Sequence, residues 1–344
     1  MRSPWGIAVL CLLGALAGAG RAFAADGGLV SGLSRALASE ENRSGAESPH
    51  LLPLLDQLAG AQFDDGALAQ AAESRRRALK IALATYGSQS TDAADAMTAL
   101  AEIDILRHDY LGAEPLLTVA ANVLSARLGA GNPALSQPLS GLARLALARG
   151  DVRLAATLAS RANSVAARDP SRSTEPLRVL GAVYAAEQRF DAGEAMLRQA
   201  LARDRRTHGD AGVETARSLA QLGNLLLRAK RFAKALPPIE EALAIDQANL
   251  GPTHPLIADD FCDLGLTYAG LNRDAEGTQV LAYAIGLLEQ GSGRDTARLA
   301  YANLDLAGVL REMGYNDAAD AAFAEGKRIL DEAGHDEREH EREL

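Results

Sequence analysis

The sequence predicts an all-α protein, a right-handed α-solenoid of about seven helix-turn-helix repeats. Two observations predict this class. Aromatic residues make up only 4% of the 344 residues, while alanine and leucine are abundant, which suits closely packed helices better than a β-sandwich. A leucine followed by alanine or glycine also recurs at a nearly constant spacing, as a stack of similar units requires.

The recurring pair defines the repeat. Successive pairs are 42 residues apart, except for one interval of 38. The pairs begin at Leu58, Leu100, Leu142, Leu180, Leu222, Leu264 and Leu306. In most units an apolar residue follows ten positions later, and an alanine ten positions after that. Each unit therefore predicts a helix, a tight turn, a second helix and a loop, and the units must stack because neither helix can bury its apolar stripe alone.

The repeat domain is expected to cover residues 48–333. Its units are expected at about 48–89, 90–131, 132–168, 169–209, 210–251, 252–293 and 294–333. A capping residue followed by proline is expected to start a first helix at Ser48, Asn132 and His254, and in the shortened part of the array at Asp169 before Pro170. His254 is thus interpreted as a boundary residue. Serine in its place is expected to change the stability by no more than about 0.5 kcal/mol.

The first 24 residues predict a secretory signal peptide. Arg2 precedes an apolar run that starts at Trp5, and Ala22-Phe23-Ala24 matches a cleavage site. The run is short for a membrane span, which needs about 20 residues, and an uncleaved anchor is the alternative interpretation. We therefore expect a periplasmic or secreted bacterial protein with no membrane span after cleavage near Ala24. Residues 25–47 are interpreted as a linker, or as a short helix that caps the first repeat.

The charge balance excludes nucleic acid as a partner. The chain has 45 acidic and 35 basic residues, a formal charge of −10. Loss of Arg2 and Arg21 with the signal would leave 33 basic residues and a charge of −12, which repels phosphate backbones. Cleavage would also leave Cys262 as the single cysteine. We interpret it as an inert, mostly buried thiol rather than a reactive one.

Two stretches carry a family resemblance. The stretch GPTHPLIADDFCDLGLTYAGLNRDAEG, residues 251–277, resembles a tetratricopeptide repeat of the longer, kinesin-light-chain-like type, and so do residues 210–251. The resemblance rests on the G-x-x-H-P start, the L-x-x-L-small core and the aromatic residue after the turn, and it covers roughly residues 48–333. It implies that the first helices line a concave groove that binds an extended peptide or a partner's helix. No asparagine precedes the leucine-small pair, so the carboxylate clamp of some relatives is not expected.

Groove residues are predicted from helical geometry. Residues two before and two after the leucine share one face of the first helix. The polar residues of this face, with the residue just before the leucine, form the predicted partner-binding groove: Asp56, Glu102, Arg144, Arg178, Gln221, Asn224, Asp263 and Asp305. Their acidic, basic and mixed zones suit a partner with its own charge pattern. The alternative is that each side chain is merely solvated.

No motif for catalysis or for a cofactor is present. The sequence contains no H-E-x-x-H, G-x-S-x-G, phosphate-binding loop or C-x-x-C. Four of the six histidines fall in or beside turns and are interpreted as surface residues: His50, His108, His208 and His254. His335 and His340 are interpreted as part of a solvated charged tail, residues 334–344. Paired acids such as Asp259-Asp260 are interpreted as turn and helix-face charges. The leading hypothesis is an exported scaffold that binds a protein or peptide without catalysis, metal or cofactor. The alternative is an enzyme acting on the envelope or cell wall, with its site on the rim of the solenoid.

Overall fold

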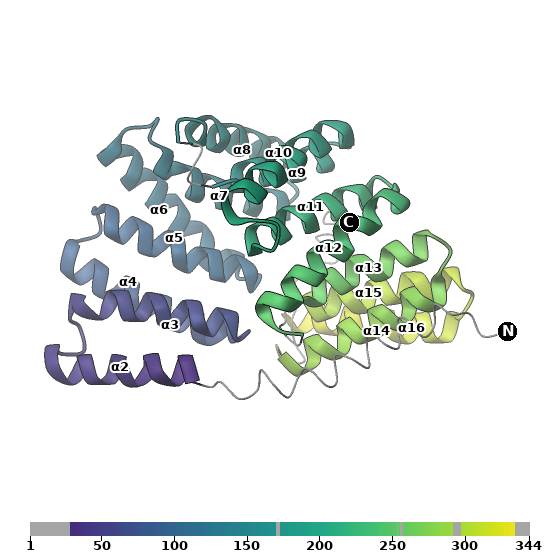
Figure 1. Ribbon diagram of the computed structural model, residues 1–344, viewed down its shortest axis with the longest axis horizontal. Coiled ribbons are helices and arrows are strands. Elements are labelled where there is room, and N and C mark those ends of the chain that lie inside the picture. The colour runs from purple at the N-terminus through teal and green to yellow at the C-terminus, as the bar shows by residue number, and fades with distance from the viewer. Residues whose placement is uncertain (1–27, 170–172, 253, 255–256, 292–296, 334–344) are drawn as a thin grey trace.

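The described chain is helical. The computed structural model describes residues 28–169, 173–252, 254, 257–291 and 297–333, and these residues contain helices and no strand (Figure 1). The predicted signal peptide and the charged tail lie outside the described residues. Within the described part, no helix combines the length and the hydrophobicity that crossing a bilayer requires.

The helices follow one another in pairs, after a first helix α2 (Gly28–Ser44) that packs on α3. The pairs are α3 (Leu52–Asp64) and α4 (Leu68–Tyr86), α5 (Thr91–Leu106) and α6 (Tyr110–Leu128), α7 (Ser136–Ala148) and α8 (Val152–Ala166), α9 (Glu175–Ala186) and α10 (Phe190–His208), α11 (Val213–Arg228) and α12 (Phe232–Leu250), α13 (Ile257–Gly270) and α14 (Asp274–Gly291), and α15 (Ala297–Glu312) and α16 (Asn316–Ala333). Short 3-10 turns, Pro49–Leu51 and Pro133–Leu135, precede α3 and α7. The predicted fold class, an all-α repeat solenoid, is confirmed.

The leucine-small pair lies where the two helices of a unit touch. On α11, Leu222 is buried, and a Cβ added to Gly223 would lie 2.3 Å from Cγ1 of Ile239 on α12. The alanines twenty positions after each leucine, from Ala78 to Ala284, are also buried. Small residues at both positions therefore set the close approach of the paired helices.

The one shorter interval between leucine-small pairs, 38 residues from Leu142 to Leu180, results from a shorter helix. α8 has 15 residues, whereas α4, α6, α10 and α12 each have 19. Four residues are close to one helical turn of 3.6 residues. Their loss therefore shortens α8 by about a turn while its apolar stripe still faces the neighbouring helices.

The turn within each unit has a repeated backbone conformation. One residue at the same place in every unit has a positive φ: Gly66, His108, Gly150, Gln188, Lys230, Asn272 and Gly314. Asp109 and Asp151 then accept hydrogen bonds from the N–H groups of the following helices α6 and α8. These aspartates close the turns, a role that the spacing of the apolar residues did not indicate.

The helix starts differ in part from those expected. The side chains of Ser48 and Asn132 accept hydrogen bonds from N–H groups two residues later, but the following prolines begin 3-10 turns rather than α-helices. The expected cap at Asp169 is wrong, because α9 begins only at Glu175. There the hydroxyl of Ser173 accepts a hydrogen bond from the Glu175 N–H at 3.1 Å.

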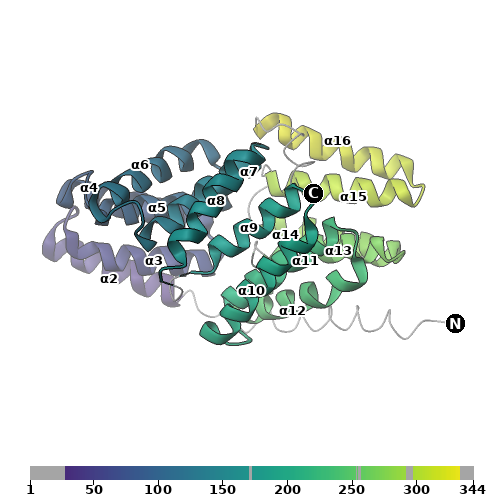
Figure 2. The ribbon, with the colours of Figure 1, turned by 90° about the horizontal axis from the view of Figure 1, so that it is seen from above.

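The stack curves until distant repeats meet. α2–α6 and α11–α16 lie on opposite sides in both views, with α7–α10 between them (Figures 1 and 2). Nε2 of His254, just before α13, lies 2.7 Å from the carbonyl oxygen of Phe63 at the end of α3. The rings of His108 and Tyr301, from the second and seventh units, have centroids 6.3 Å apart. The inner side of the superhelix is therefore enclosed by its own ends.

These contacts correct the interpretation of two histidines. His254 is 3% exposed, and its ring centroid lies 5.9 Å from that of Phe63. Nδ1 of His108 lies 2.8 Å from the Tyr110 hydroxyl. Both side chains are packed between elements, because the curvature of the array brings a second surface against the turns that carry them. His254 is therefore more than a helix-boundary residue.

Candidate functional site

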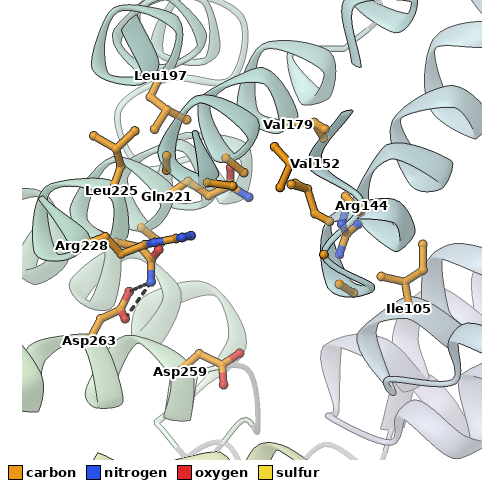
Figure 3. A pocket seen from close by; sticks show the side chains of 18 of the residues that line it. Ile105, Arg144, Val152, Val179, Leu197, Gln221, Leu225, Arg228, Asp259 and Asp263 are labelled. Atoms are coloured by element: carbon orange, nitrogen blue, oxygen red, sulfur yellow. Dashed lines mark hydrogen bonds between the residues drawn. The ribbon is translucent and has the colours of Figure 1, made fainter. Parts of the chain in front are cut away.

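A groove runs along the inner side of the superhelix. A cavity of about 760 Å³ is lined mainly by the first helices α5, α7, α9, α11 and α13, and a second of about 560 Å³ continues along α11, α13, α15 and α16. Asn224 and Arg228 line both cavities. In Figure 3, Arg144, Val152 and Val179 project from one side of the first cavity toward residues on the other side. We refer to the two adjoining cavities as the inner groove.

Four positions of the first helices recur in the lining of the inner groove. One is five residues after the leucine, where the lining residues are Ile105, Leu147, Ala185, Leu227, Ala269 and Arg311. Two residues after the leucine, the lining residues are Arg144, Ala182, Asn224, Leu266 and Gly308. Six residues after it, they are Leu106, Ala148, Ala186, Arg228, Gly270 and Glu312. Just before it, they are Val179, Gln221, Asp263 and Asp305. The residue two before the leucine is instead buried between helices in several units, including Thr98, Ser140 and Arg178.

The structure brings five of the eight predicted site residues to the inner groove. They are Arg144, Gln221, Asn224, Asp263 and Asp305. Asp56 instead lies exposed on α3 and pairs with Arg75 of α4. Glu102, half-buried on α5, and Arg178 on α9 are also outside the lining. The residue six after the leucine was missed, although the same periodicity that identifies the residue two after it points to the next turn of the same face.

Arg178 is a structural residue and not the exposed contact that the sequence led us to expect. Its side chain is 1% exposed and makes ion pairs with Glu175 at 2.8 Å, Asp204 at 3.2 Å and Glu214 at 2.7 Å. Burial alone would raise the pKa of Glu175, but Arg178 and then Arg144 outweigh it and lower that pKa to about 2. The network joins α9, α10 and α11 and thereby fixes two successive repeats.

One wall of the inner groove carries acidic side chains of α13. Asp263 accepts hydrogen bonds from Nδ2 of Asn224 at 3.1 and 3.4 Å. Burial raises the pKa of Asp263 to about 7, because the Asn224 hydrogen bond offsets it only in part and the neighbouring Asp259 and Asp305 add to it. Asp259 is held by Arg298, whose Nε and Nη2 lie 3.0 and 2.6 Å from its two oxygens.

Asp260 is buried, which corrects its interpretation as a helix-face charge. It is 6% exposed, and among the described residues its Oδ2 has no hydrogen-bond partner. Burial and then the charge of Asp246 raise the pKa of Asp260 well above its usual range. Burial likewise raises the pKa of Asp246 to about 6. The two carboxyls interact, so they hold a proton more firmly than exposed aspartates do.

The facing wall is largely apolar. Ile105 of α5, Val152 of α8 and Val179 of α9 line it, across the cavity from Asp259 and Asp263 (Figure 3). Arg144 is the charged residue of this side, with Nη1 3.8 Å from Oε1 of Glu175. The lining of the first cavity therefore contains three arginines, Arg144, Arg228 and Arg298, as well as the three aspartates of α13.

Neither a metal site nor a reactive thiol emerges from the described residues. They contain no group of three or more His, Cys, Asp or Glu side chains arranged to hold a metal ion. Cys262 packs against the core of the later repeats. Burial raises the pKa of its thiol well above the usual range, so the reactive thiolate is disfavoured.

Fold and groove define the chain as a helical-repeat solenoid with a concave inner surface. Residues 174–248, which span α9 to α12, match the tetratricopeptide repeat family model. The resemblance to tetratricopeptide repeats is thus confirmed for this segment. No curated protein matches the chain.

Solved structures share the fold. The chain is similar to a Rap protein complexed with competence and sporulation factor, at 15% identity over 86% of this chain and 78% of that one, with a TM-score of 0.58. It is also similar to aspartyl phosphate phosphatase F from Bacillus subtilis, at 13% identity over 86% and 74%, with a TM-score of 0.58. TPR-like repeats of a putative kinesin light chain from Podosopora anserina match at 18% identity over 59% and 97%, with a TM-score of 0.47. At such identities, the two matches with TM-scores of 0.58 establish a shared fold alone.

Proposed function

We propose that this protein is an exported scaffold that binds a peptide or an extended segment of a partner protein in the inner groove, without catalysis. The observation that carries the proposal is the continuity of the groove. Its two cavities share Asn224 and Arg228 and pass across the inner helices from α5 to α16. A long trough lined by side chains of successive repeats fits a chain better than a compact small molecule.

The comparisons support the same class of function. Tetratricopeptide repeats are typical of protein-interaction scaffolds, and residues 174–248 match that family. The Rap protein of similar fold was crystallised with competence and sporulation factor bound. Export rests on the predicted signal peptide, and we propose that cleavage near Ala24 releases the mature chain into the periplasm or the medium.

Site-specific photocrosslinking in the source cells tests the groove. A photoreactive residue at Ala182 or Gly308, one in each cavity, is expected to crosslink to the same partner. Gly286 on α14 is the matched control position, because it lies outside both cavities and, like Gly308, has no atom within 4 Å of an added Cβ. Partners captured equally from groove and control positions would contradict the proposal.

A second experiment in this test fills the inner groove with a large side chain. Gly308→Trp places a large side chain in open space within the second cavity and is expected to abolish the crosslink at Ala182. Gly286→Trp, outside both cavities, is expected to leave it intact. Cell fractionation and N-terminal sequencing test export separately: the expected mature N-terminus is Ala25, whereas a full-length chain retained in the membrane fraction would indicate an uncleaved anchor.

A further inference from the structure

We propose that the two ends of the superhelix form a pH-sensitive closure, which is shut at neutral pH and opens when His254 is protonated on mild acidification. The closure consists of the contact of His254 with Phe63 and the contact of His108 with Tyr301, between units that are far apart in the sequence. It goes beyond the proposed function, because it operates whatever the inner groove binds. Three features of the described residues carry it: the lack of a shared core across the closure, its place in the wall of the first cavity, and a buried imidazole.

The ends are joined less firmly than successive units are. Successive units share continuous buried cores, such as the one that extends from Ala185 of α9 to Leu330 of α16. Within the described residues, no such core joins the first two units to the last two. Regions with few buried apolar contacts separate at the lowest free energy, so the closure can open while each unit keeps its own packing.

The closure also forms part of the wall of the first cavity. His108 and Tyr110 of the second unit line this cavity together with Asp259 of the sixth unit and Arg298 of the seventh. Separation of the ends would therefore move these two groups of residues apart and open the inner groove along its side. A chain could then enter or leave sideways, without being threaded through an enclosed groove.

His254 is suited to respond to pH because its side chain is buried in the closure, where it is 3% exposed. Its Nε2 lies 2.7 Å from the carbonyl oxygen of Phe63, which can only accept a hydrogen bond. Nε2 therefore carries a proton in the closed form, and a second proton must be taken up at Nδ1. The resulting imidazolium ion is poorly solvated when buried, whereas water solvates it in the open form. Protonation therefore favours the open form.

The charges around His254 do not reverse this preference. Burial lowers the pKa of His254 below its usual 6.5, although the hydrogen bond to Phe63 raises it. Arg298 of α15 lowers the same pKa further, and Asp64 and Asp65 at the end of α3 raise it. The closed form thus binds fewer protons than the open form, and it loses stability relative to the open form as the pH falls through 6.5. Burial also raises the pKa of Asp64, which favours the closed form as the pH falls and so opposes His254.

Single-molecule fluorescence transfer across the closure tests the proposal. The dyes are attached at Gln57→Cys on α3 and Ala282→Cys on α14, two exposed positions on opposite sides of the closure. Cys11→Ser and Cys262→Ala remove the natural thiols. Between pH 7.5 and pH 5.5 the ratio of open to closed molecules is expected to increase severalfold, with about tenfold as the limit for one histidine. Equal transfer efficiency at the two pH values would overturn the proposal.

Substitutions of histidine assign the response to His254. The amide of glutamine can donate to the Phe63 carbonyl but does not titrate, so His254→Gln is expected to stay closed at both pH values. His254→Ser, which removes the contact, is expected to be open at both. The exposed His50 provides the matched control, and His50→Gln is expected to respond as the wild type does. A pH response that persists in His254→Gln, or that disappears in His50→Gln, would overturn the proposal.

Asp65→Asn decides the matter if glutamine fails to hold the ends together at pH 7.5, because this variant keeps the histidine. It removes a carboxylate that favours the imidazolium ion in the closed form. The opening at pH 5.5 is therefore expected to be larger than in the wild type. An unchanged or smaller opening would overturn the proposal.

Discussion

Asp263→Asn is expected to stabilise the protein at alkaline pH and to reduce the dependence of its stability on pH. The pKa of the buried Asp263 carboxyl is about 7, against its usual value of 3.8. Between about pH 4 and pH 7 the folded state therefore holds a proton that the unfolded state has lost. Because the pKa of this acid is raised on folding, stability falls as the pH rises through that window, and the full loss is present above pH 7.

The size of the effect follows from the same pKa values. About three pH units at 1.36 kcal/mol each set an upper limit of about 4 kcal/mol for the whole window. From pH 5 to pH 8 only the part up to pH 7 contributes, which is about 2–3 kcal/mol. Asparagine has nearly the same shape, can still hydrogen-bond to Asn224 and does not ionise.

Urea denaturation of both proteins at pH 5 and pH 8 measures this difference. Asp246 and Asp260 also titrate. Because the charge of Asp263 helps to raise the pKa of Asp260, its removal is expected to reduce that contribution as well, in the same direction. The stability advantage of the variant is expected to grow by about 2–3 kcal/mol between the two pH values. A constant advantage, or a variant less stable than the wild type at pH 8, would refute the assignment of a raised pKa to Asp263.

Three further changes test the packing of the array, each by urea denaturation. Arg178→Leu is expected to destabilise the protein by about 3–5 kcal/mol, because it leaves buried carboxylates without their cation. Gly223→Ala is expected to cost about 1–3 kcal/mol, because the new methyl group overlaps Ile239. His254→Ser is expected to cost about 1–3 kcal/mol, more than its boundary position alone suggests, because it removes the contact with Phe63. For this last variant, small-angle scattering is also expected to show a larger radius of gyration as the ends separate.

Matched controls distinguish these effects from general sensitivity to substitution. Arg217→Leu removes an exposed arginine paired with Glu214 and is expected to change the stability by less than about 1 kcal/mol. Gly60→Ala meets no atom within 4 Å and is expected to stabilise α3 by about 0.5–1 kcal/mol. His50→Ser alters an exposed histidine and is expected to have almost no effect. A control that loses as much stability as its counterpart would contradict the corresponding explanation.

The helical pairs could be predicted from the sequence because they depend on local periodicity. Leucine, a small residue and an apolar residue at fixed spacing specify where two helices touch, as Gly223 shows. The site could be predicted only in part. Arg144 lies two residues after the leucine of its unit, whereas Arg178 lies two residues before the leucine of the next unit. Which of these two positions faces the inner groove depends on how neighbouring units pack. That packing buried Arg178 and left Arg144 at the groove.

The contacts that close the superhelix could not be predicted from spacing within a repeat. His254 and Phe63 are 191 residues apart, and their meeting depends on the curvature summed over the intervening units. A small change in the angle between successive repeats, multiplied several times, would separate them. The burial of Asp260 has the same kind of origin, since it depends on how α12 packs against α13.

The buried carboxyls Asp204 and Asp260 are accommodated in two different ways. Asp204 is 1% exposed and is satisfied by the guanidinium of Arg178, so its charge contributes to the joint between repeats. Asp260 is nearly as buried, but its partner is another acid, Asp246 of α12, and the pair holds a proton more firmly than an exposed aspartate does. The same chain thus shows that it can pair a buried acid fully where the fold requires it.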